Sequence, residues 1–107
     1  MMCAVAVRRI RPGSYDAFRK AWQHDPWLPS YERALVFRNE DSADQVLTIA
    51  FFDGTPDEYD AARDDPETMA AEERRLHRIA DVEEQVVLSA VFELVEEVLP
   101  PPEPASD

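Results

Sequence analysis

Apolar residues gather in four stretches of this chain that have the length and composition of β-strands, and they lie at residues 3–10, 34–38, 45–52 and 86–95. The third stretch, from Gln45 to Phe52, is rich in β-branched and aromatic residues, and Asp53-Gly54 closes it. Alternate residues of a strand face opposite sides, yet this strand is apolar on both. We therefore expect protein to cover each face of the sheet to which it belongs.

Helical spacing appears between the strands. Tyr15, Phe18 and Trp22 form one apolar stripe after a predicted N-cap at Ser14, and Asp25-Pro26 ends that helix. A second helix should begin at the clearest local signal in the chain, the capping box of Thr55-Pro56-Asp57-Glu58.

The second helical region is predicted to break once. Asp65-Pro66 interrupts it and starts a longer helix, whose buried stripe should contain Met69, Leu76 and Ile79.

The resulting order is strand, helix, strand, strand, broken helix, strand. It predicts an α+β ferredoxin-like β-α-β-β-α-β fold with a four-stranded antiparallel sheet. We expect residues 1–99 to form this domain and the proline-rich residues 100–107 to form a disordered tail. Because helices would cover only one apolar face, the other face predicts a homodimer that forms through the sheet.

Charge narrows the range of partners. The chain carries 11 Lys and Arg against 23 Asp and Glu, a formal net charge of −12, which argues against binding to nucleic acid or to an anionic membrane. No apolar run approaches the roughly 20 residues of a membrane-spanning helix, and no signal peptide is recognisable. The single Cys3 has no partner within the chain, so we expect a reducing, cytoplasmic location.

Several segments together resemble the antibiotic biosynthesis monooxygenase-like (ABM-like) domains of the dimeric α/β-barrel superfamily. The resemblance rests on residues 7–13 leading into the first helix, on residues 46–53, on Tyr59 in the second helix and on Asp65-Pro66-Glu67. It implies two sheets facing each other in a dimer, and a pocket for a small aromatic or polyketide-like molecule. It also implies oxygenase chemistry without a cofactor, in which a base deprotonates a phenolic substrate whose carbanion reacts with oxygen.

The chain departs from some branches of this superfamily. The haem-degrading branch has an asparagine in the first strand and a Trp and a His in the second helix. This chain has no Asn in its first strand, and the aligned helical positions fall near Ala62 and Glu72. Phe52 stands where a Trp is common, which keeps an apolar wall but removes an N–H donor. Haem degradation is therefore disfavoured.

The resemblance directs attention to a set of candidate site residues. The predicted catalytic residues are His24, as the base, and Tyr31. The predicted ligand-binding residues are Trp22, Phe18, Thr48, Phe52 and His77. No metal site is predicted, since neither histidine has a second His or Cys three or four residues away.

Most of these candidates also have a structural interpretation. His24 could bind the last carbonyls of the first helix, His77 could lie at the rim or in solvent, and Trp22 and Phe18 could belong to the core. The alternative function is accordingly a non-catalytic binding or interaction protein of the same fold. A cavity of a few hundred Å³ lined by His24, Tyr31 or Thr48 would distinguish a ligand site from a core closed by aromatic side chains.

Overall fold

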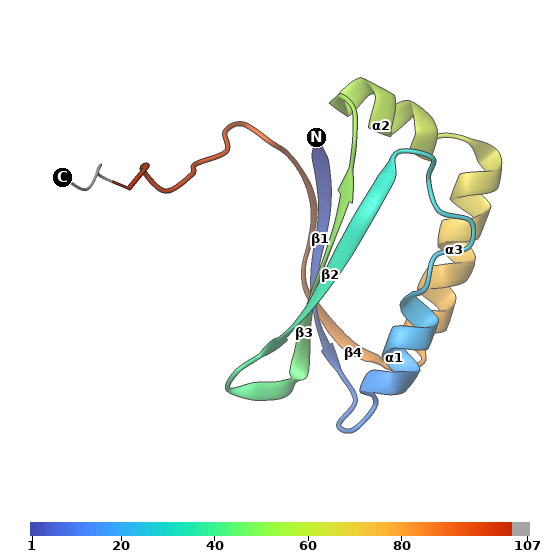
Figure 1. The fold of residues 1–107 in the computed structure, drawn as a ribbon. Coiled ribbons are helices and arrows are strands. Elements are labelled where there is room, and N and C mark those ends of the chain that lie inside the picture. The colour runs from blue at the N-terminus through green and yellow to red at the C-terminus, as the bar shows by residue number, and fades with distance from the viewer. Residues whose placement is uncertain (104–107) are drawn as a thin grey trace.

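The structure, a computed structural model, describes residues 1–103, so residues 104–107 of the tail predicted at 100–107 lie outside the described residues. Its elements follow the predicted order (Figure 1). They are β1 (Met2–Ile10), α1 (Tyr15–Trp22), β2 (Tyr31–Asn39), β3 (Ser42–Phe52), α2 (Pro56–Arg63), α3 (Pro66–Ala80) and β4 (Glu83–Glu93).

The four strands form one antiparallel sheet in the order β2-β3-β1-β4, and the helices lie on one side of it (Figure 1). This arrangement confirms the α+β ferredoxin-like fold. Strands β1 and β3 occupy the middle of the sheet, where Ala4 lies opposite Ala50 and Ala6 lies opposite Thr48. On the other side of β1, Ala6 lies opposite Ser89 of β4.

The helices cover the face of β3 that carries Val46, Thr48, Ala50 and Phe52, all of which are buried. Two small clusters form the core there. One cluster contains Ile10, Phe18, Trp22, Val46 and Ile79. The other contains Met2, Ala50, Phe52 and Tyr59.

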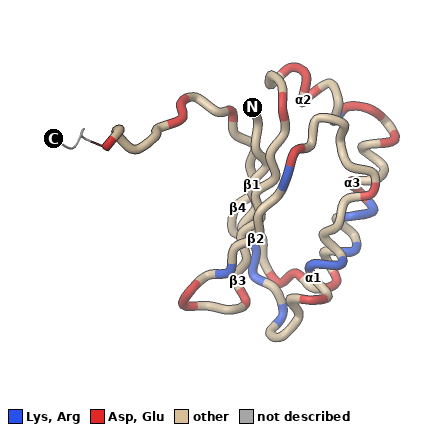
Figure 2. The backbone as a smooth tube through the Cα atoms, in the orientation of Figure 1, with Lys and Arg blue, Asp and Glu red and all other residues tan. Residues whose placement is uncertain are grey.

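The opposite face of the sheet, which we call the outer face, is apolar and carries no helix (Figure 1). The strand registers place these residues on it: Cys3, Val5, Val7, Leu35, Phe37, Leu47, Ile49, Phe51, Leu88, Ala90 and Phe92. Phe37 and Phe92 are about half exposed, at 53% and 48%. Charged residues concentrate on helices, loops and strand ends, which leaves the middle of the sheet largely uncharged (Figure 2).

The helix ends follow the local signals in most places. Thr55 and Glu58 form the predicted capping box, in which Glu58 N–H donates to Thr55 Oγ1 at 3.2 Å and Thr55 N–H donates to Glu58 Oε1 at 3.0 Å. Asp65 caps α3 by accepting from Thr68 N–H at 3.1 Å. The side chain of Ser14 makes no capping hydrogen bond to α1, and its hydroxyl donates to the carbonyl of Arg11.

The predicted stripe of α3 was wrong in part. Ile79 is fully buried, but Met69 and Leu76 are 58% and 48% exposed. Both side chains line the cavity described below, and Arg75 takes a buried position on this helix instead. The spacing of apolar residues alone cannot predict which side of α3 is buried, because the buried side of this helix includes a charged residue, Arg75.

Beyond Glu93 the chain leaves the sheet, and residues 94–103 form no helix or strand (Figure 1). The N–H of Leu94 still donates to the carbonyl of Met1 at 2.8 Å, whereas Val95 is 93% exposed. Among the described residues, no helix is both long and apolar enough to cross a membrane.

A cavity between the sheet and the helices

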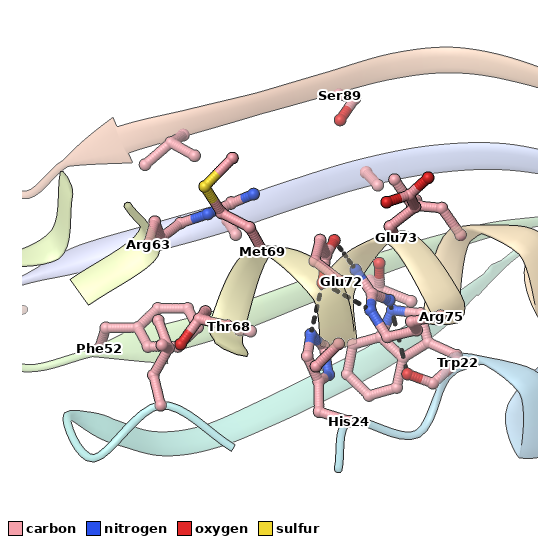
Figure 3. A pocket seen from close by; sticks show the side chains of 18 of the residues that line it. Trp22, His24, Phe52, Arg63, Thr68, Met69, Glu72, Glu73, Arg75 and Ser89 are labelled. Carbon is pink, nitrogen blue, oxygen red and sulfur yellow. Dashed lines mark hydrogen bonds and ion pairs between the residues drawn. The ribbon is translucent and has the colours of Figure 1, made fainter. Parts of the chain in front are cut away.

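A cavity of about 890 Å³ lies between the covered face of the sheet and the helices (Figure 3). Small side chains create it, since Ala4, Ala6 and Ala50 from the central strands and Ser89 from β4 all line it and leave the space between sheet and α3 unfilled. A volume of this size is in the range of sites for small organic ligands.

The two ends of the cavity differ in chemistry. At one end, Arg8 follows Ala6 on the same face of β1 and lies opposite Val46 of β3. At the other end, Met2 precedes Ala4 on the same face of β1 and lies opposite Phe52. The ring of Phe52 contacts that of Tyr59 at a centroid distance of 5.1 Å. Arg63 also lines the cavity at this end, where it donates to the hydroxyl of Tyr59 at 3.0 Å, so the aromatic end carries an arginine as well.

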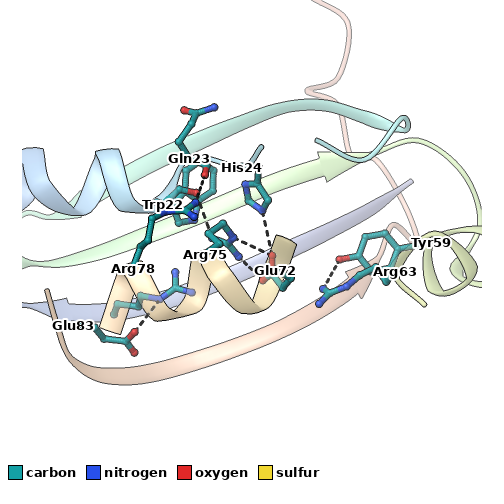
Figure 4. A network of polar contacts seen from close by, with 10 residues as sticks. Trp22, Gln23, His24, Tyr59, Arg63, Glu72, Arg75, Arg78 and Glu83 are labelled. Carbon is teal, nitrogen blue, oxygen red and sulfur yellow. Dashed lines mark hydrogen bonds and ion pairs between the residues drawn. The ribbon is translucent and has the colours of Figure 1, made fainter. Parts of the chain in front are cut away.

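A network of polar side chains lines the helix side of the cavity (Figure 4). Arg75 donates from Nε to Glu72 Oε2 at 3.0 Å and from Nη2 to Glu72 Oε1 at 2.6 Å, which makes a bidentate ion pair. Arg75 Nη1 also donates to the carbonyl of Trp22 at 3.5 Å, and Arg78 donates to the carbonyl of Gln23 at 3.0 Å. Arginines of α3, and not His24, thus bind the carbonyls at the end of α1.

His24 lies beside this network, packed against aromatic rings. Its Nε2 is 3.9 Å from Glu72 Oε2, and its Nδ1 is buried without a hydrogen-bond partner in the described part of the chain. Its ring lies 4.3 Å from that of Trp27 and 5.1 Å from that of Trp22, between centroids. Burial, together with the positive charge of Arg75 and against the opposing effect of Glu72, lowers the pKa of His24 from 6.5 to about 4. His24 is therefore a neutral imidazole at pH 7.

The structure brings four of the seven predicted site residues to the cavity. These four are His24, Trp22, Thr48 and Phe52. Three others lie elsewhere: Phe18 is fully buried in the core, Tyr31 stacks on Trp27 at 3.9 Å between ring centroids, and His77 is exposed on α3.

Three arginines of the cavity were not among the predicted site residues, namely Arg8, Arg63 and Arg75. In sequence alone, a cluster of arginines at the end of a strand is most simply explained by solubility. Alternation along β1 carried the missing signal, because Arg8 shares a face with Ala4, Ala6 and Ile10. Among residues 1–103, no group of three or more His, Cys, Asp or Glu is placed to hold a metal ion.

The fold and the cavity together define a class, the α+β proteins with a ligand-sized space under a ferredoxin-like sheet. No family model and no curated protein matches the chain. Solved structures do match it. SnoaB, a cofactor-independent oxygenase from Streptomyces nogalater, aligns with a TM-score of 0.63 and 13% identity over 90% of this chain and 94% of its own.

Two further structures give the same result. Rv0793 from Mycobacterium tuberculosis aligns with a TM-score of 0.63 and 13% identity over 90% of this chain and 96% of its own. A protein from Chloroflexus aurantiacus that carries the provisional name antibiotic biosynthesis monooxygenase aligns with a TM-score of 0.64 and 13% identity, over 90% and 94% of the two chains. The chain therefore has the fold of an ABM-like domain, as its resemblance implied.

Proposed function

We propose that this protein is a cofactor-independent monooxygenase that oxidises a small aromatic or polyketide-like substrate in the cavity under its sheet. The observation that carries this proposal is the cavity itself, which places a neutral imidazole, a hydroxyl and aromatic walls around a space large enough for such a molecule. The similarity of fold to SnoaB, an oxygenase that uses no cofactor, supports the same class of reaction.

The residues suit the first step of this chemistry. His24 would accept a proton from the substrate, because the imidazole is already neutral at pH 7 and Glu72 lies close enough to stabilise the imidazolium that forms. The hydroxyl of Thr48 lies on the buried face of β3 and would donate a hydrogen bond to the substrate oxyanion. Trp22 and Phe52 would hold the aromatic body between them.

The remaining steps need only oxygen. The substrate carbanion would transfer electrons to O₂ and form a carbon-bound peroxide, which takes up a proton. Loss of water from that peroxide leaves a ketone, so one methylene and one O₂ give one carbonyl and one water. No metal or flavin has to store electrons in such a sequence, since the electron-rich substrate is itself the reductant.

We also propose that the protein works as a homodimer in which the outer faces of two sheets pack together. Burial of a large apolar side chain contributes about 1.5 to 3 kcal/mol, so covering the half-exposed residues of the outer face would contribute on the order of 10 kcal/mol. Association costs an estimated 4 to 15 kcal/mol, a range that this contribution can offset. Helices occupy the other face, so the dimer would leave the cavity in place.

Oxygen uptake tests the proposed activity. The purified protein would be incubated with a panel of hydroxyanthrones and quinols, with and without air, beside the variants His24→Ala and His77→Ala. We expect uptake with at least one substrate, a loss of about 100-fold in His24→Ala, and little change in His77→Ala, whose side chain is exposed. Absence of turnover across the panel, or equal rates in the two variants, would contradict the proposal.

One observation favours the second candidate, a non-catalytic small-molecule-binding protein. A histidine with a pKa of about 4 holds a proton weakly at pH 7, which makes it a weak base unless the bound ligand strengthens it. A binding protein would show saturable quenching of tryptophan fluorescence by members of the same panel, since Trp22 lines the cavity, without any consumption of oxygen.

A further inference from the structure

Arg8 is a charged side chain buried at one end of the cavity with little to neutralise it. Only 7% of the side chain is exposed, and neither Nε nor Nη1 has a hydrogen-bond partner among the described residues. The carboxylate of Glu83 is 3.8 Å from Nε, which is an ion-pair distance but too long for a hydrogen bond. Such a group destabilises a fold unless something pairs with it.

The neighbouring acidic groups do not fill this role. Both oxygens of Glu72 already accept hydrogen bonds from Arg75. Glu73 and Asp25 line the cavity too, but both residues are exposed, so water screens their charge. Burial lowers the pKa of the Arg8 guanidinium, and the charge of Arg75 adds to this effect against Glu83 and Glu72.

A second copy of the chain cannot supply the missing partner through the outer face. Arg8 alternates with Val7 along β1, and it is Val7 that lies on the outer face, paired with Leu47. Arg8 lines the cavity instead. Whatever pairs with its guanidinium must therefore enter the cavity.

We propose that Arg8 binds the carboxylate of an aromatic acid whose apolar body lies along Ala4 and Ala6 toward Phe52. This inference rests on the proposed function only in requiring that the cavity binds a small molecule. The planar guanidinium fork matches a carboxylate, and the buried Nε and Nη1 of Arg8, which have no hydrogen-bond partner among the described residues, are free to donate to one.

The dimensions agree with this orientation of the ligand. Arg8 lies four positions beyond Ala4 along β1, a distance of about 13 Å at about 3.3 Å per residue. The methyl groups of Ala4 and Ala6 and the small side chain of Ser89 leave this length of the sheet open. An aromatic acid with two or three fused rings could place its carboxylate at Arg8 and its far ring near Phe52.

A pair of ligands of equal shape tests the inference. Binding of 2-naphthoate and of 2-naphthamide would be measured by isothermal titration calorimetry at pH 7. We expect the acid to bind at least about tenfold more tightly than the amide to the unmodified protein. Equal affinities would mean that cavity water alone solvates Arg8 and would overturn the inference, and so would an acid that does not bind measurably.

Two variants assign the preference to this residue. Arg8→Met should abolish the difference between acid and amide while it leaves the affinity of the amide unchanged. Arg11→Met, which removes an exposed arginine outside the cavity, should keep the tenfold difference. If Arg8→Met retained the preference for the acid, another cation would be responsible and the inference would be wrong.

Folding of the variants is controlled separately. Arg8→Met should unfold at a denaturant concentration at least as high as the unmodified protein, because it removes a poorly paired buried charge. If Arg8→Met fails to fold, Arg8→Lys tests the inference in its place, since this variant keeps the positive charge but lacks the guanidinium fork. Its preference for the acid over the amide should fall several-fold. An unchanged preference in Arg8→Lys would contradict recognition by the fork.

The results separate this inference from the proposed oxygenase activity. A preference for the acid without oxygen uptake would support carboxylate binding and contradict the oxygenase. Oxygen uptake from neutral quinols, combined with equal binding of acid and amide, would support the oxygenase and overturn the role of Arg8.

Discussion

The pH dependence of stability is the sharpest test of the environment that the cavity creates around His24. The pKa of this histidine is about 4 in the folded protein, against 6.5 for an unperturbed imidazole. A pKa that is lowered on folding means that the folded state resists protonation. The corresponding stability is fully present above pH 6.5, and it is lost as the pH falls toward the folded pKa of about 4.

The magnitude follows from the two pKa values. Each pH unit between them is worth about 1.4 kcal/mol, so protonation of His24 in the unfolded chain should remove about 3 kcal/mol of folding free energy between pH 7 and pH 4. This is a large share of the roughly 5 to 15 kcal/mol that stabilises an ordinary domain.

Urea unfolding at pH 7, 6, 5 and 4 measures the effect. The protein also titrates many carboxylates in this range, so the informative quantity is the difference between the unmodified protein and His24→Phe, which cannot take up a proton. We expect the loss of unfolding free energy from pH 7 to pH 4 to be smaller by about 3 kcal/mol in His24→Phe.

His77→Phe is the matched control, because this second histidine is exposed on α3. Its pH profile should run parallel to that of the unmodified protein. If His24→Phe also ran parallel, the surroundings of His24 would not lower its pKa, and the environment inferred for this histidine would be wrong.

Three further perturbations test the fold and the assembly. Glu72→Gln should destabilise the protein by about 3 kcal/mol at pH 7, since it leaves the buried Arg75 unpaired. Glu73→Gln, at the exposed neighbouring position, should change the free energy of unfolding by less than about 0.5 kcal/mol. Equal urea midpoints for the two variants would contradict the ion pair. Thr55→Ala should cost about 1 kcal/mol by the same assay through loss of the cap of α2, and an unchanged midpoint would show that the cap contributes nothing. Ile49→Lys on the outer face should convert the proposed dimer into a 12.2 kDa monomer in light scattering, and an unchanged dimer would place the interface elsewhere.

Local structure in this chain follows from short-range signals. The capping box at Thr55 starts α2 at Pro56, and Asp65-Pro66 separates α2 from α3, as the sequence predicts. These signals act through groups three or four residues apart, so they need no knowledge of the fold. Ser14 is the exception, since its hydroxyl donates to the carbonyl of Arg11 and its side chain makes no hydrogen bond that caps α1.

The candidate site was predictable only in part. The aromatic residues and His24 could be predicted as site residues from the sequence, because their side-chain chemistry is distinctive in any context. Phe18 and Tyr31 have the same chemistry yet pack away from the cavity, in the core and against Trp27. Composition identifies which residues suit a pocket, but the path of the chain determines which of them reach it.

The sequence by itself determined the order of the elements, and alternation determined which residues of each strand share a face. It left open which of the two faces meets the helices, because both are apolar. Only the tertiary structure decided that Val46, Thr48, Ala50 and Phe52 face inward, which turns Leu47 and Ile49 outward and buries Arg8. The cavity likewise depends on alanines of β1 and β3 meeting in register across the sheet, and contacts between strands far apart in the chain have no local signature.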